Sequence, residues 1–199
     1  MNQAGLELAA RVAQPTQRVV SRAQNCNCPE DLGPFTEEST IAVVELVFPE
    51  QGCLQRRLFD SFDSEAMGQC AFCGTPSMVR RTVVLSNPSQ VLVLSVNRVR
   101  IISRGRVGVN TDEFLVPDIL EVPTLQGLKP YKLVAAVQHS GSASSGHYVS
   151  HLKLPSGAYI KVDDDKRIVP SPENAIRRSQ LFVYVESLNA SEDEEMLLA

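Results

Sequence analysis

Hydrophobic and polar residues alternate along much of this chain with a period of two, which is typical of half-buried β-strands. Two stretches instead have helical features: residues 54–62, with apolar positions at helical spacing, and residues 171–178, which begin with a serine followed by a proline. The alternation predicts strands over 40–48, 78–85, 90–99, 112–116, 131–138, 147–154, 158–162 and 180–186. We therefore expect an α+β fold built mostly from antiparallel strands.

The two ends of the chain differ from this pattern. Residues 1–18 are expected to form a short helix and a linker, with the helix ending at Pro15. Glu7 and Arg11 interrupt the apolar stretch there, so it lacks the hydrophobic core of a signal peptide. Residues 188–199 are acidic and are expected to be disordered. The folded domain is accordingly assigned to residues 19–187.

Composition narrows the class of protein. The 199 residues are 43% hydrophobic and 21% charged, which is ordinary for one soluble globular domain. A net charge of −4 gives no reason to expect binding to nucleic acid or an anionic membrane. No apolar run approaches the roughly 20 residues of a membrane-spanning helix. We expect the protein in the cytoplasm or the nucleus, where cysteine thiols stay reduced.

Four of the five cysteines occur as two close pairs, Cys26 with Cys28 and Cys70 with Cys73. Two such pairs brought together by neighbouring strands would make a tetrahedral site of four sulfurs, the geometry of structural zinc. The alternative is that some of them are ordinary buried thiols. Cys53 lies outside both pairs and is expected to have no chemical role.

A histidine and an acidic residue are expected to meet at one end of the sheet. His147 follows Gly146 at the start of a predicted strand, and Asp163 comes sixteen residues later, after one hairpin. A histidine oriented by a carboxylate is two-thirds of a cysteine-protease triad, the general base and its orienting group. An acidic run such as 163–165 is otherwise usually a solvated turn. His151 is expected to be structural.

These residues resemble the histidine box of the ubiquitin-specific protease family. The shared elements are Tyr131 to Val137, His139-Ser140-Gly141, Gly146-His147-Tyr148, Tyr159, Asp163-Asp164 and Phe182-Val183-Tyr184. The run 87–94 and the two thiol pairs also resemble family features, so the resemblance covers roughly residues 19–187. It implies the fingers and the palm of the papain-like catalytic domain, without its N-terminal helical thumb.

The resemblance also implies roles for particular residues. His147 would be the general base, Asp163 would orient it, and Asp164 would lie near the oxyanion site. Gly141, Gly146 and Tyr148 would bind substrate along the narrow channel for the C-terminal tail of ubiquitin. Zinc held by the four cysteines would stabilise the fingers, which would grip the body of ubiquitin.

The chain departs from the family pattern in one decisive respect. The family's nucleophile lies in a box of the form G-x-x-N-x-G-N-x-C, and residues 1–30 contain nothing similar. Tyr159 stands where many relatives have tryptophan, Asn97-Arg98-Val99 replaces a common Arg-Phe pair, and the first thiol pair has one spacer residue instead of two. The base and its orienting acid are therefore present without a recognisable nucleophile.

Three hypotheses follow. The favoured one is the palm-and-fingers part of a cysteine-type deubiquitinase, which is inactive alone and needs a thumb-containing segment or chain. Such a part would expose an apolar patch where the thumb packs. The second is a non-catalytic module that binds ubiquitin or a ubiquitinated protein. The third, least favoured, is a self-sufficient hydrolase that uses Cys53 or Cys28 as its nucleophile.

Overall fold

The computed structural model describes residues 15–24, 26, 28–29, 33–48, 52–103, 106–142, 145–172 and 174–187. The predicted N-terminal helix over 1–14 and the predicted acidic tail lie outside these residues. Within them, no helix is both long enough and apolar enough to cross a membrane.

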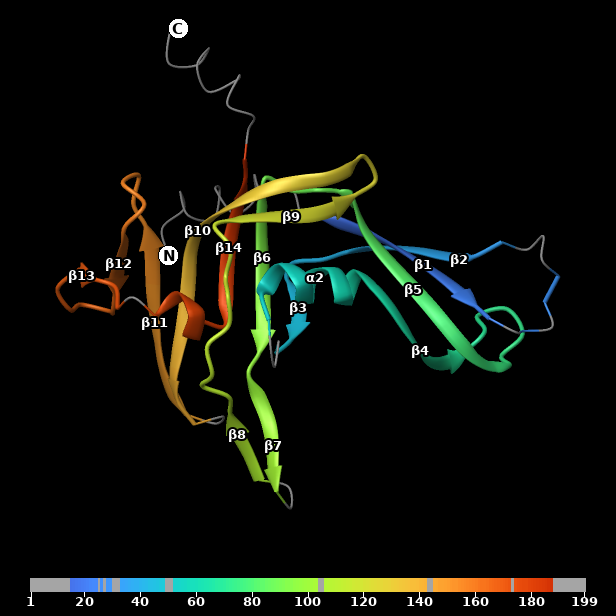
Figure 1. Cartoon of the computed structure of the whole chain (residues 1–199), viewed down its shortest axis with the longest axis horizontal. Coiled ribbons are helices and arrows are strands. Elements are labelled where there is room, and N and C mark those ends of the chain that lie inside the picture. The colour runs from blue at the N-terminus through green and yellow to red at the C-terminus, as the bar shows by residue number, and fades with distance from the viewer. Residues whose placement is uncertain are drawn as a thin grey trace, which may run out of the picture.

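Seven strands form one sheet, which we call the palm sheet (Figure 1). Every neighbouring pair in it is antiparallel except β3 and β6. In spatial order the strands are β13 (Val169–Pro170), β12 (Tyr159–Val162), β11 (Gly146–Lys153), β10 (Gly127–Gly141), β14 (Leu181–Glu186), β6 (Val91–Asn97) and β3 (Val44–Val47).

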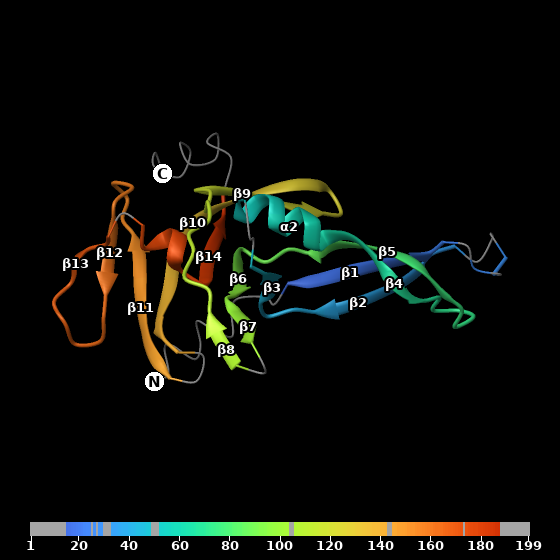
Figure 2. The same cartoon turned by 60° about the horizontal axis from the view of Figure 1, so that its bottom comes forward.

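Four further strands extend away from the palm as a second, wholly antiparallel unit, which we call the finger sheet (Figure 2). They are, in spatial order, β4 (Asp63–Gln69), β5 (Pro76–Asn87), β1 (Thr16–Ala23) and β2 (Phe35–Thr40). β9 (Ile119–Thr124) joins the two sheets, because it pairs with β10 and also bridges to β5 at Leu85. β1 begins at Thr16, three residues before the predicted domain boundary at residue 19.

The hydrophobic core lies where palm and fingers meet. The helix α2 (Leu54–Phe62) packs there against β3, β4, β5 and β9 (Figure 1). Its buried residues, Leu54, Leu58 and Phe62, recur every four positions and form one continuous apolar face. This helix and the predominance of antiparallel pairing confirm the predicted α+β class.

Several predicted boundaries change in the structure. The strand expected over 90–99 is two strands, because the chain leaves the palm sheet at Arg98 and continues as a separate hairpin of β7 (Val99–Ser103) and β8 (Arg106–Val109). The strand expected over 112–116 is wrong, since one isolated bridge between Cys53 and Leu115 is all that forms there. The helix expected over 171–178 is shortened to a 3₁₀ turn over Ile176–Arg178.

Arg98 contacts the segments in which these changes occur. Its guanidinium group is buried, with 4% of the residue exposed, and it stacks on the rings of Phe48 and Phe114 at 5.0 and 4.9 Å. Burial lowers the pKa of Arg98 from 12.5 to about 10. It donates hydrogen bonds to four backbone carbonyls, those of Ser179 at 3.0 Å, Asn110 at 3.1 Å, Asp112 at 2.8 Å and Arg177 at 2.8 Å. In or next to the segments predicted to be a strand (112–116) and a helix (171–178), backbone carbonyl groups therefore accept hydrogen bonds from this side chain instead of from regular secondary structure.

Candidate functional site

The predicted hairpin brings His147 and Asp163 together at one end of the palm sheet. His147 lies at the start of β11, and Asp163 follows directly after β12, the strand paired with β11. The Nε2 atom of His147 lies 2.6 Å from Oδ1 of Asp163. The Asp163 side chain is 6% exposed and that of His147 is 46% exposed. The carboxylate is thus fixed inside the protein, and the imidazole reaches the surface.

Asp163 is surrounded by donors. Lys161 Nζ lies 2.9 Å from its Oδ2 atom, and Lys166 Nζ lies 3.1 Å from its Oδ1 atom. The hydrogen bond with His147, followed by that with Lys161, lowers the pKa of Asp163 well below the ordinary value of 3.8. The carboxylate is therefore ionised throughout the physiological pH range.

The orientation of the imidazole decides which nitrogen is available for chemistry. Because Asp163 meets Nε2, the nitrogen left free in this arrangement is Nδ1, whereas protease triads usually use the two in the opposite sense. Rotating the ring by half a turn about the Cβ–Cγ bond exchanges each nitrogen with a ring carbon, so this rotation does not bring Nδ1 to Asp163. Asp164 lies farther off, with its Oδ2 atom 3.8 Å from His147 Nε2, in a turn where its φ is +47°.

The glycines on either side of the loop before His147 are required by the hairpin itself. Gly141 and Gly146 are register partners at the ends of β10 and β11, and Gly141 has a φ of +145°. A Cβ atom on Gly146 would overlap Nε2 of His139 and lie 2.6 Å from the carbonyl oxygen of Ser140, and one on Gly141 would overlap the carbonyl oxygen of Ser145. Both positions must lack a side chain for the hairpin to close.

A cleft of about 420 Å³ adjoins this hairpin on the side of β7 and β8. Tyr148 forms part of its wall, and its ring contacts that of His139 at a centroid separation of 4.7 Å. Val99, Val109 and Gly146 also line it, so glycine, aliphatic and aromatic groups share one wall. The predicted substrate-binding residues Gly146 and Tyr148 therefore line one cleft, and His147, which lies between them in sequence, is not among the residues that line it.

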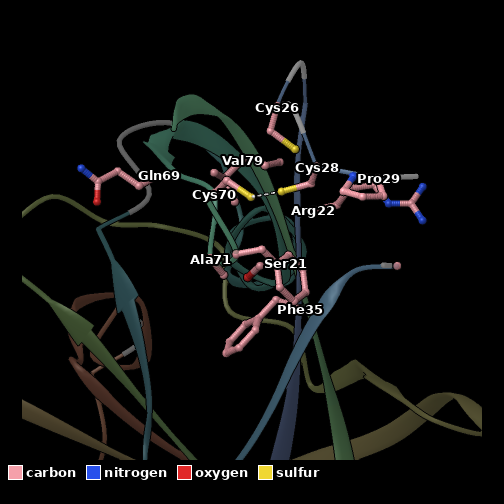
Figure 3. A pocket seen from close by; sticks show the side chains of 13 residues that line it. Ser21, Arg22, Cys26, Cys28, Pro29, Phe35, Gln69, Cys70, Ala71 and Val79 are labelled. Carbon is pink, nitrogen blue, oxygen red and sulfur yellow. Dashed lines mark hydrogen bonds between the residues drawn. The ribbon is translucent and has the colours of Figure 1, made fainter. Parts of the chain in front are cut away.

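The structure brings the four paired cysteines together at the far end of the finger sheet, although the pairs are about forty residues apart in sequence. The sulfur atoms of Cys26, Cys28, Cys70 and Cys73 all lie within 4.8 Å of one another. Cys28 Sγ is 3.7 Å from Cys70 Sγ, and Figure 3 shows these two side chains pointing at each other. Zn–S bonds of about 2.3 Å in a tetrahedron place neighbouring sulfurs about 3.8 Å apart. The cluster thus fits a tetrahedral metal ion.

The protonation of the thiols is uneven. Hydrogen bonds with the side chain and backbone of Thr75 lower the pKa of Cys73 to about 6, and hydrogen bonds with the backbone of Cys73 and Phe72 lower that of Cys70. The hydrogen bond with Cys73 raises the pKa of Cys28 to about 12. Thiolates form readily at the turn between β4 and β5, and a cation would complete the ionisation of the group.

A hollow of about 760 Å³ lies beside the thiols (Figure 3). It is lined by the face of β1 and β2 that carries Ser21 and Phe35, and by the cysteine turn. Phe35 packs edge-on against Phe72 at 6.1 Å and ties β2 to that turn.

Comparison with known proteins identifies the family. A family model described as ubiquitin carboxyl-terminal hydrolase matches residues 14–185, which is most of the chain. The chain belongs to this family. It is a domain of the ubiquitin-specific protease type, as the histidine box and the thiol pairs indicate.

Relatives and solved structures agree with this assignment. The chain is 26% identical over 145 residues to human ubiquitin carboxyl-terminal hydrolase 17-like protein 10, covering 71% of this chain and 25% of that protein. It is 25% identical to human 17-like protein 6, covering 71% and 34%. The chain thus spans about a quarter to a third of the length of these relatives.

Two solved structures share the fold. One is the SAGA Ubp8/Sgf11/Sus1/Sgf73 DUB module bound to ubiquitin aldehyde, with a TM-score of 0.70, 18% identity, and coverage of 88% of this chain and 41% of that chain. Another is a yeast SAGA DUB module, with a TM-score of 0.71, 17% identity, and coverage of 94% and 46%. At this identity the likeness establishes the papain-like fold.

Sequence reasoning missed some residues around the site. Lys161 lies on β12 two positions before Asp163, which directly follows the strand, so continuing the period of two would have placed both side chains on one side. His151 is buried and bonded to Ser171 Oγ at 2.9 Å, in keeping with the expected structural role. Cys53 caps the start of α2, and the described group around His147 contains no cysteine.

Proposed function

We propose that this chain is the palm and fingers of a cysteine-type deubiquitinase, which bind ubiquitin and supply the general base for cleavage at its C-terminus. The observation that carries this proposal is the 2.6 Å contact between the half-exposed His147 and the buried Asp163. Membership of the ubiquitin carboxyl-terminal hydrolase family supports ubiquitin as the substrate.

In this function, His147 takes the proton from a cysteine thiol, and the thiolate attacks the carbonyl carbon of the isopeptide bond. Asp163 holds the imidazole in place and stabilises the imidazolium that forms. The nucleophile comes from a thumb-containing segment or chain, because Cys28 belongs to the thiol cluster and Cys53 is not grouped with His147 among the described residues. Without that nucleophile, the palm and fingers are inactive.

Zinc at the four thiols has a structural role in this proposal. The spacing of the sulfurs fits zinc, and the pairs come from the end of β1 and from the turn between β4 and β5. A bound ion would cross-link the far end of the finger sheet, which has little hydrophobic core of its own. The metal takes no part in the reaction.

The palm sheet offers a surface for the thumb. On the side opposite the core, Val91 and Val93 of β6 and Val183 of β14 are half-buried, and Val93 and Val183 are register partners. Val47 and Tyr148 continue the same side and are exposed. Apolar side chains exposed together on one sheet face favour a protein partner.

The decisive experiment uses ubiquitin that carries an electrophile at its C-terminus. The purified, zinc-loaded chain should bind this ubiquitin in a titration and form no covalent adduct. Addition of a family thumb segment that carries the nucleophile box should restore adduct formation at the cysteine of the thumb. A stable adduct on the chain alone, mapped to Cys53 or Cys28, would contradict the proposal.

Two matched variants test the residues. Asp163→Asn should abolish turnover in the reconstituted pair, whereas Asp165→Asn, a change of the same kind at an exposed neighbouring position, should leave turnover within about twofold. His147→Gln should abolish turnover while ubiquitin binding persists. Ubiquitin binding without turnover, even with an intact thumb, would instead favour the non-catalytic ubiquitin-binding module.

A further inference from the structure

The carboxylate that orients His147 carries an unusual load of positive charge. Besides His147, it accepts hydrogen bonds from two ammonium groups, those of Lys161 and Lys166. To orient the imidazole ring, the carboxylate needs only its contact with His147. The two lysine ammonium groups must therefore have another role.

The positions of both lysines are fixed by the secondary structure that carries them. Lys161 lies on β12, two positions before Asp163, which directly follows the strand, and the Lys161 side chain is only 32% exposed. Lys166 lies in the turn that follows, which is closed by a backbone hydrogen bond from Lys166 N to Asp163 O at 3.0 Å. The two ammonium groups thus approach the carboxylate from the strand and from the turn.

We propose that Lys161 and Lys166 are positioning residues that fix Asp163 and offset its negative charge, so that His147 keeps the neutral, proton-accepting form. This inference rests on the proposed role of His147 as the general base. An unshielded carboxylate at 2.6 Å would favour the imidazolium, which cannot accept a proton. With two lysines on the same carboxylate, that preference is reduced.

The charged and titratable groups around His147 lie on β12, on the turn that follows it, and on β10 and β11. The groups near it on β12 and the following turn are Asp163, Asp164, Lys161 and Lys166, which together carry no net charge. On β10, Gln138 and Ser140 face the same side as His147 and are uncharged. His139 of β10 lies against Gly146. On β11 itself, His151 is buried, and desolvation followed by the charge of Lys161 lowers its pKa, which favours its neutral form.

The magnitude follows from the distances. Lys166 Nζ and His147 Nε2 both contact Oδ1 of Asp163, so these two nitrogens are at most about 6 Å apart. A unit charge at that distance, partly screened by solvent, changes the half-protonation pH of a neighbouring group by about half a unit. Removal of either lysine should therefore be measurable.

The test is an NMR pH titration of the His147 ring in the zinc-loaded chain, which needs neither thumb nor activity. Lys161→Met and Lys166→Met should each raise the half-protonation pH of His147 by about half a unit. Lys161→Arg, which keeps the charge, should leave it within about 0.2 units. Lys153→Met is the matched control, because Lys153 pairs with Asp118 instead.

The outcomes are separable. An unchanged or lower half-protonation pH in both methionine variants would overturn the proposal and leave the lysines a purely structural role. Lys166 is 69% exposed, so its variant stays folded and keeps the test valid if Lys161→Met does not fold. Titration of the same samples with ubiquitin tests the proposed function separately. If the wild-type chain does not bind ubiquitin but the His147 titration still shifts in the lysine variants, the proposed function is refuted and the role of the lysines stands.

Discussion

Replacement of Arg98 by methionine should destabilise the domain by about 3–5 kcal/mol. The side chain supplies four hydrogen bonds to carbonyls at 2.8–3.1 Å. At about 1.5–2 kcal/mol for each bond with a charged donor, their loss costs roughly 6–8 kcal/mol. The variant also recovers the cost of burying the charge, which the lowering of the Arg98 pKa from 12.5 to about 10 puts at roughly 3 kcal/mol. The difference gives the net loss.

Thermal and urea unfolding of the zinc-loaded chain measure this effect. For a domain of this size, each kcal/mol changes the Tm by roughly 2–4 °C, so the variant should melt on the order of 10 °C lower. Arg56→Met is the matched control, because Arg56 is 78% exposed and pairs only with Asp60 across one helical turn. It should cost less than about 0.5 kcal/mol. A loss below about 1 kcal/mol for Arg98→Met would refute the conclusion that this side chain holds the segments 110–112 and 177–179 in place.

Three further results are expected. Gly146→Ala should destabilise the domain by about 2–3 kcal/mol, because its Cβ would lie 2.6 Å from the backbone carbonyl oxygen of Ser140. Gly157→Ala, with open space and a φ of +86°, should cost about 1 kcal/mol, and equal losses would contradict the close packing at the hairpin. Burial lowers the pKa of His151, so protonation of this residue favours the unfolded chain. The stability that the neutral ring contributes is fully present above about pH 6.5, and at lower pH the free energy of unfolding should decrease by up to about 1.4 kcal/mol per pH unit. Urea unfolding at several pH values measures this slope, which His151→Asn should remove. Chelation of zinc should lower the Tm of the wild-type chain. In elemental analysis, Cys70→Ser should lose the stoichiometric zinc, whereas Cys53→Ser should retain it. Full zinc content in Cys70→Ser would contradict the four-thiol site.

The periodicity of the sequence was sufficient for some of the elements with one buried face. The strand β14 and the helix α2 have regularly spaced buried residues, and their predicted ranges agree with the structure to within one residue. The strand β10 extends beyond its predicted range at both ends, and β9 was not predicted although its buried and exposed residues alternate. The finger strands β2 and β4 were not predicted. Almost every residue in these two strands is exposed, so their sequences show no alternation of hydrophobic and polar residues that would predict a strand.

The candidate site was predictable to the same extent. A hairpin of known length placed Asp163 beside His147, and paired thiols indicated a four-sulfur cluster, since both rest on local geometry. Arg98 could not be predicted. Its four acceptors are backbone carbonyls, which every residue carries, so no side-chain pattern reveals which segments will gather around a buried guanidinium group.

By itself, the sequence determined the local elements of this protein: which stretches alternate, where the turns lie, and which reactive side chains begin or end a strand. Only the tertiary structure decided the environment of those side chains. The break at Arg98 depends on segments that lie far apart along the chain, because its guanidinium group binds carbonyls of the segments 110–112 and 177–179. Such contacts form through the packing of whole sheets, and local spacing carries no record of them.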